Sequence, residues 1–139
     1  METVSYIKMT FIASVGFLLG YATEALGGYD NFLRTLIVMM FVDIMTGWIV
    51  ALYRKTKKAE GGPIGINGLL KKGCMLLVVT VAVVLDSLLD THGLTRDAVI
   101  IAFMLNELVS ILENIGQVGV KMPEALTNAL EMLHKNNKK

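Results

Sequence analysis

The sequence predicts an all-α integral membrane protein with four transmembrane helices and a short C-terminal amphipathic helix. Hydrophobic residues make up 54% of the 139 residues. Charged residues make up 18%, below the roughly 25% that is usual for soluble domains. The remaining charges gather between long apolar runs, as expected for loops between spans. The length has room for a single membrane domain, residues 1–139.

Four apolar runs define the predicted helices. The run 6–26 is longer than the apolar part of a signal peptide and is interpreted as a retained helix. The run 32–53 is long enough to cross a bilayer core of about 30 Å at about 1.5 Å per residue. The run 73–89 is rich in valine and leucine. The run 97–117 carries polar residues, so it either spans the membrane or lies in the interface, which would leave three spans.

Basic residues predict the orientation of the chain. The loop 54–72 carries six basic residues against one acid, Glu60. The positive-inside bias therefore places this loop in the cytoplasm, and four spans then place both termini there. After the fourth run, residues 123–133 predict the amphipathic helix, and Thr95 is a candidate cap for a helix beginning at Arg96. The predicted membrane-surface basic residues are Arg54, Lys55, Lys57, Lys58, Lys71 and Lys72.

An acid lies halfway along the second apolar run. Asp43 is followed by Thr46 and Gly47, and this spacing places the three on one helix face. A carboxylate at this depth needs a polar partner or water, and the glycine permits close approach of another helix. Two interpretations remain open. The stripe is either a helix-packing site or the lining of a water-filled path.

The fourth run has a polar face as well. Asn106, Ser110 and Glu113 share one side of a helix, and Glu107 lies beside them. We group these four residues with the Asp43 stripe as candidates for pore lining or subunit contact. Small residues predict helix packing elsewhere, since they let backbones approach closely in lipid. These are Gly16 and Gly20 in the first run, and Gly73 and Thr80 in the third.

No pattern in the sequence predicts an enzyme. His92 and His134 have no metal-ligand spacing with each other or with Cys74, the single cysteine. Nucleophile-elbow, phosphate-loop and zinc-protease motifs are missing. The basic run 54–58 has no aromatic residues interleaved for stacking on bases. We therefore expect no catalytic residues, no cofactor or metal, and no nucleic-acid partner.

Several segments together resemble a known family. They are DIMTG at 43–47, GINGLLKK at 65–72, NELVSILEN at 106–114 and GVKMP at 119–123. In order, spacing and total length the chain resembles the toxin-secretion and phage-lysis holins (the phage holin family 4 type) over about residues 32–133. Gly61-Gly62-Pro63 departs from this pattern, because a serine-containing loop is expected there.

The resemblance implies a small phage-type protein of the bacterial host cytoplasmic membrane. Such a protein oligomerises in the lipid bilayer and opens pores or lesions that release an endolysin, or a toxin in some relatives, without binding this cargo stably. An antiholin is a further implied partner. Met9 could start a shorter form. Two rival hypotheses stay open, namely a small oligomeric ion channel or transporter subunit and a non-conducting, antiholin-like membrane regulator.

Overall fold

The computed structural model describes residues 2–54, 66–128 and 132. The long helices in these residues are α1 (Glu2–Ala25), α2 (Asn31–Arg54), α3 (Ile66–Leu89) and α4 (Leu94–Gln117). Each has 24 residues. All four are long and apolar enough to cross a membrane. The predicted all-α class with four membrane helices is confirmed.

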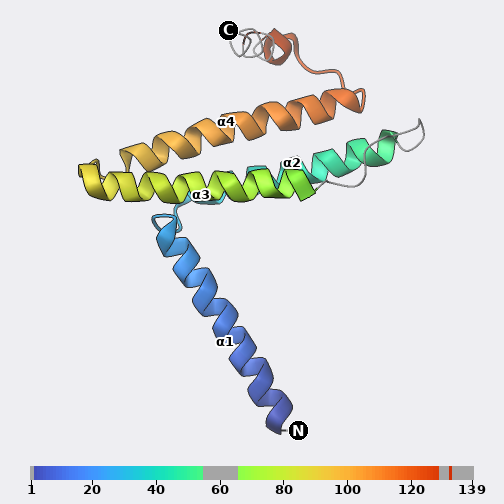
Figure 1. The fold of residues 1–139 in the computed structure, drawn as a ribbon. Coiled ribbons are helices and arrows are strands. Elements are labelled where there is room, and N and C mark those ends of the chain that lie inside the picture. Colours follow the sequence, from blue (N-terminus) through green and yellow to red (C-terminus); the bar gives the residue numbers. More distant parts are fainter. Residues whose placement is uncertain (1, 55–65, 129–131, 133–139) are drawn as a thin grey trace.

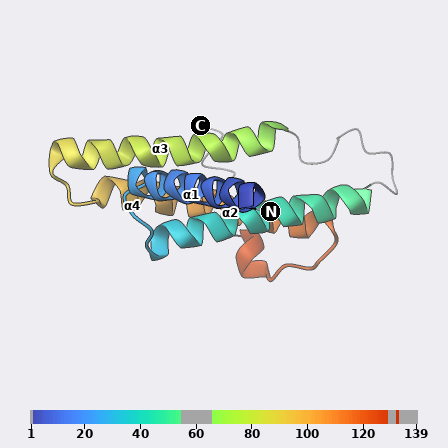
Figure 2. The ribbon, with the colours of Figure 1, turned by 90° about the horizontal axis from the view of Figure 1, so that it is seen from below.

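Helices α2, α3 and α4 form a bundle, and α1 stands apart from it. Helix α4 packs against both α2 and α3, and the three run side by side in Figure 1 and Figure 2. Helix α1 leaves the bundle at an incline (Figure 1). We call the end of the bundle at residues 26–30 and 90–93 the turn end. The opposite end, where α2 and α4 finish and α3 begins, is the loop end.

The apolar core lies in the half of the bundle nearer the turn end. Leu36 and Met40 of α2 pack with Val79 of α3 and Ile100 of α4, and all four side chains are buried. The core residues lie within the first ten residues of α2 and α4, and in the second half of α3. Close packing is what holds helices together in lipid. This half of the bundle is therefore held mainly by side-chain packing.

Helix α1 is exposed on every side. None of the residues of its span is buried. The hydroxyls of Thr10 and Ser14 donate to carbonyl oxygens of the same helix, so they require no partner from another helix. A Cβ added at Gly16 or Gly20 would meet no atom within 4 Å among the described residues. An added side chain at either glycine would thus meet no other described helix, and their packing role stays a prediction for contacts between chains.

All four helices begin earlier than the sequence predicts, α1 at Glu2 instead of residue 6 and α2 at Asn31 instead of residue 32. Helix α3 starts at Ile66 instead of residue 73, so the polar segment 66–72 is helical. Lysine is a good helix former, and a charge inside a span is tolerated when it finds a partner. Helix α4 starts at Leu94, and Thr95 is not its cap. Of the predicted amphipathic helix 123–133, residues 124–128 are helical, whereas 129–131 and 133 lie outside the described residues.

Candidate functional site

A charged cluster joins the three bundled helices, near the middle of α2 and α4 and in the first third of α3. The Lys72 ammonium of α3 donates to Oδ2 of Asp43 on α2 over 2.9 Å. It also donates to Oε2 of Glu107 on α4. One lysine therefore bridges carboxylates from two other helices. We call this group, together with the polar residues that bond to it, the lysine cluster (Asp43, Thr46, Lys72, Glu107, Ser110 and Asn114).

Helix α4 supplies further donors to Asp43. The hydroxyl of Ser110 donates to Oδ1 of Asp43 over 2.6 Å, and the amide of Asn114 donates to the same oxygen over 3.1 Å. The Asn114 amide also donates to the hydroxyl of Thr46 over 3.1 Å. That hydroxyl donates in turn to the backbone carbonyl of Asp43. Both carboxylate oxygens of Asp43 are thus satisfied across helix boundaries.

The three charged side chains of the lysine cluster are largely buried. The exposed fraction of the side chain is 11% for Lys72, 17% for Asp43 and 3% for Glu107. A buried charge is costly unless it is paired and hydrogen-bonded, and removing one member of such a pair is strongly destabilising. Within a bilayer the alternative solvent is hydrocarbon, which makes pairing more important still. The cluster therefore ties the bundle together through paired charges, and removal of one of them would leave another without its partner.

A pocket that opens to the surface lies next to the lysine cluster. A cavity of about 460 Å³ lies between α2, α3 and α4 on the loop-end side of the apolar core. Asp43, Lys72 and Glu107 line it, together with Gly68 from the first turn of α3 and Glu113 from the last turns of α4. A polar cavity of this size has room for water, which stays where it finds polar partners.

The structure brings together most of the polar residues that the sequence singles out. Ser110 of α4 bonds to Asp43, Asn114 of α4 bonds to Thr46, and Glu107 joins them through Lys72. Gly47 lies under α4, since a Cβ there would come within 3.8 Å of the Asn114 amide. Asn106 and Glu113 are more exposed and line the cavity. Whether this set lines a pore or contacts other subunits stays a prediction.

The structure corrects the prediction for Lys72. The sequence places it with the membrane-surface lysines, but its side chain is buried and ion-paired inside the bundle. The reason is the early start of α3, which puts Lys72 on the face turned toward α2 and α4. Lys71, one position earlier, is exposed. Arg54 is the last residue of α2. Lys55, Lys57 and Lys58 lie outside the described residues.

Asn114 belongs to the lysine cluster but is not one of the predicted site residues. It lies four residues after Ser110, which is the spacing of side chains on one helix face. That spacing was the available signal. Within the part of the chain that the structure describes, a Cβ added at Gly73 of α3 would meet no atom within 4 Å, and the hydroxyl of Thr80 donates to the Leu76 carbonyl of its own helix. The predicted packing role of these two residues stays a prediction.

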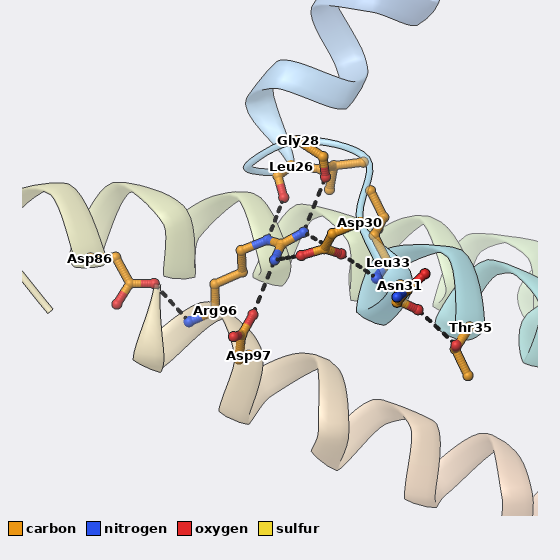
Figure 3. Close-up of polar contacts among 9 residues, drawn as sticks. All are labelled: Leu26, Gly28, Asp30, Asn31, Leu33, Thr35, Asp86, Arg96 and Asp97. Atoms are coloured by element: carbon orange, nitrogen blue, oxygen red, sulfur yellow. Dashed lines mark hydrogen bonds and ion pairs between the residues drawn. The ribbon is translucent and has the colours of Figure 1, made fainter. Parts of the chain in front are cut away.

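A second charged group closes the turn end (Figure 3). Arg96 of α4 donates through both terminal nitrogens to the Asp30 carboxylate, at 2.6 and 3.2 Å. Its Nε donates to the Leu26 carbonyl over 2.7 Å, and Nη2 donates to the Gly28 carbonyl over 3.1 Å. Asp97 accepts a further bond from Nη1. We call these residues, Leu26, Gly28, Asp30, Arg96 and Asp97, the arginine cluster; it fixes the α1–α2 turn onto α4.

Asp86 of α3 caps the start of α4. Its Oδ1 accepts the backbone N–H of Thr95 over 2.9 Å, and its Oδ2 accepts that of Arg96 over 2.8 Å. The hydroxyl of Thr91 also donates to it. The first N–H groups of a helix have no partner within the helix, and an anion there is stabilising. A carboxylate from the preceding helix thus supplies the cap that the sequence assigns to Thr95.

Arg96 also sets the charge state of its partner. The hydrogen bonds from the Arg96 guanidinium hold the pKa of the Asp30 carboxyl below its ordinary value, although partial burial acts in the opposite direction. Asp30 lies between the spans and is half exposed. It also accepts the backbone N–H of Leu33 over 2.9 Å, which caps α2. Asp30 is therefore a charged carboxylate at neutral pH.

These features define a class: a multi-pass helical membrane protein whose charged side chains pair with one another inside a bundle. In the described part of the chain, His, Cys, Asp and Glu form no group of three or more that could hold a metal ion. The bacteriophage holin family matches residues 20–135. The chain belongs to that family.

Individual relatives agree with this assignment. The chain is similar to an uncharacterised 14.9 kDa protein of Clostridium perfringens, with 41% identity over 98% of this chain and 97% of the relative. It is 34% identical to an uncharacterised protein of Listeria monocytogenes over 86% of this chain and 81% of that one. A protein of Bacillus phage phi105 named "Probable holin" is 32% identical over 84% of both chains. No solved structure matches the chain.

Proposed function

We propose that this protein is a phage-type holin that oligomerises in the bacterial cytoplasmic membrane and forms lesions through which an endolysin, or a toxin, leaves the cell. Family membership supports this, and so does the relative named as a probable holin. The observation that carries it is the lysine cluster with its adjoining cavity, a charged interior inside an otherwise apolar bundle. No catalytic role, cofactor or nucleic-acid partner is part of the proposal.

The physical basis is the polar face of α4. In the single chain α2 and α3 cover part of this face and satisfy the hydrogen bonds of Glu107, Ser110 and Asn114. Polar side chains in lipid associate strongly with other polar groups or line water. Several copies could therefore place the faces that carry Asn106, Glu107, Ser110 and Glu113 around a shared aqueous lesion. The same residues would serve as subunit contacts where the faces meet.

The proposed orientation places the loop end and both termini in the cytoplasm. Its support is the basic loop 54–72, which follows the positive-inside bias. The turn end would then face outward, where the acids Asp30, Asp90 and Asp97 outnumber Arg34 and Arg96. Anionic lipid headgroups of the inner leaflet would attract the basic loop. Reporter fusions at either terminus test this orientation independently of lysis.

The function is tested by inducible expression in bacteria that also produce a cytoplasmic endolysin. We expect collapse of the membrane potential followed by release of folded endolysin and lysis. Loss of potential with release of ions only would support the channel hypothesis. Insertion with no loss of potential would support the antiholin-like regulator. Either result would overturn the proposed function.

Two substitutions link the function to the site. Asp43→Leu and Glu107→Leu should change the time of lysis or abolish it, while immunoblots of membranes show normal insertion. Glu24→Leu is the matched control, because Glu24 is an exposed acid of α1 outside the lysine cluster. Lysis at the normal time by both cluster variants would show that the charged interior has no part in the activity.

A further inference from the structure

Lys72 lies close enough to the start of α3 to reach the membrane surface, yet its side chain points into the bundle. It lies six residues after the start of α3, about 9 Å from the loop end at about 1.5 Å per residue. Asp43 lies about 18 Å along α2 from the turn end, and Glu107 about 20 Å along α4 from the same end. A lysine this close to the end of a span normally extends its side chain toward the headgroups. Here the ammonium is held inward by two carboxylates.

The charges of the lysine cluster are unequal. One ammonium faces two carboxylates and donates to both of them. Asp43 keeps hydrogen bonds from Ser110 and Asn114 without the lysine. Glu107, with a side chain only 3% exposed, receives its hydrogen bond from Lys72. Withdrawal of the lysine would break the bonds that join α3 to both carboxylates and leave two like charges in a poorly solvated interior, which favours movement of α3 away so that water reaches them.

The two halves of the bundle are held differently. The turn end has the apolar core of Leu36, Met40, Val79 and Ile100, together with the arginine cluster. The loop-end half has the cavity beside the lysine cluster. Both α2 and α3 pack on α4, and Lys72 bonds to each of α2 and α4 from α3. Separation that begins at Lys72 would therefore open the loop end while the turn end stays packed.

We propose that Lys72 is a latch that controls the opening of the bundle. In the closed chain it holds α3 over the polar face of α4. On release, the ammonium moves to the loop-end membrane surface, α3 swings away about the turn end, and the polar face of α4 becomes available to a second copy of the chain. This inference rests on the proposed holin function and deepens it, because it names the contact that regulates the same site.

The first arm of the test uses the time from induction to lysis at matched protein levels in the membrane. Lys72→Met removes the charge and keeps the length of the side chain, so we expect earlier lysis. Lys72→Arg keeps the charge and should lyse later than Lys72→Met. Lys71→Met is the control, because it removes the same charge from the exposed neighbour and should leave the time unchanged. Normal timing for Lys72→Met would overturn the latch.

A variant without the three charges tests whether the two like charges, and not a loss of packing at Lys72, cause the bundle to open. In the triple variant Asp43→Asn, Lys72→Met, Glu107→Gln, no like charges remain to push the helices apart. We expect it to stay closed longer than Lys72→Met alone, by delayed lysis or by slower thiol labelling as described next. If the triple variant opened as early as Lys72→Met, repulsion between the two carboxylates would not be the cause of opening.

The second arm measures opening without lysis. Cys74 is replaced by serine, and a single cysteine is placed at Val109, which lines the cavity, or at Val79, which is fully buried in the turn-end core. The probe is a water-soluble maleimide added to membranes with the loop end accessible. Lys72→Met should raise the labelling rate at position 109 by roughly tenfold or more, given the large effect of unpairing a buried charge. Position 79 should stay unlabelled.

The outcomes distinguish the latch from the function. Faster labelling at 109 with protection at 79 supports the latch, even if no endolysin is ever released and the holin proposal fails. Equal labelling of Lys72→Met and Lys72→Arg at position 109 overturns the latch, even if both variants lyse cells. Faster labelling at both 109 and 79 means that the whole bundle loosens, and this also overturns opening about the turn end.

Discussion

The guanidinium of Arg96 occupies the space beside Gly27 where a side chain would begin. A Cβ added to Gly27 would lie 2.7 Å from Nε and 2.8 Å from Cδ of Arg96. The arginine is held there by the Leu26 and Gly28 carbonyls and by Asp30, so it cannot easily move aside. The turn that leads from α1 into the bundle therefore requires a residue without a side chain at this position.

Gly27→Ala should destabilise the protein more than Gly28→Ala does. Both glycines have positive φ angles, 82° and 94°, so each alanine should cost about 1–2 kcal/mol of backbone strain. Only Gly27→Ala adds the collision with Arg96, since nothing lies within 4 Å of a Cβ at Gly28. Thermal unfolding in detergent micelles measures the difference. Equal losses for the two variants would show that Arg96 does not fill this space.

Arg96→Gln should destabilise the turn end by about 1–3 kcal/mol, because it leaves buried hydrogen-bonding groups without partners. The Arg96 side chain is 7% exposed and donates to two backbone carbonyls as well as to Asp30. Arg34→Gln is the control, because Arg34 is exposed on α2 and should change stability by less than about 0.5 kcal/mol. Similar unfolding temperatures for the two variants would contradict the role of Arg96.

The same contact predicts a dependence of stability on pH. Because Arg96 lowers the pKa of Asp30 in the folded protein, the charged carboxylate favours folding at pH values above its unfolded pKa. This stabilisation should be lost as the pH falls through the lowered folded pKa. The effect should be modest, since Asp30 is partly exposed to solvent. Comparison of the wild type with Asp30→Asn from neutral to strongly acidic pH measures it, and parallel curves would disprove the contribution.

Thr46 and Asn114 should be energetically coupled across α2 and α4. The amide of Asn114 donates to the Thr46 hydroxyl over 3.1 Å. Hydrogen bonds between membrane helices contribute about 0.6 kcal/mol on average. A double-mutant cycle of Thr46→Val and Asn114→Ala should give a coupling energy of about this size. The control cycle pairs Asn114→Ala with Thr80→Val, because the Thr80 hydroxyl donates to the Leu76 carbonyl of its own helix. This coupling should be near zero.

The fold was predictable from the sequence because its signal is local. Long apolar runs show up as spans wherever they occur, and all four runs correspond to helices. The need of Asp43 for polar partners follows from its depth alone. The face of Thr46, and that of Ser110, follow from helical spacing. The bonding partners themselves do not follow from the sequence, which predicts both polar stripes only as pore lining or subunit contact.

The contacts of Lys72 and Arg96 could not be predicted in this way. Lys72 follows a basic loop, and its buried position depends on α3 starting seven residues before the apolar run does. Arg96 and Asp30 are 66 residues apart, and no periodicity connects them. The isolation of α1 was equally hidden, because its composition resembles that of the packed helices. Such features depend on which faces meet, and this is decided by the whole bundle.

All four long helices in the described residues contain 24 residues, or about 36 Å each at 1.5 Å per residue. Equal lengths mean that hydrophobic mismatch would affect every helix in the same sense. A thin bilayer would force all of them to tilt together, and a thick one would relieve that tilt. The acyl-chain length of the surrounding phospholipids thus becomes a single variable that acts on the molecule as a unit.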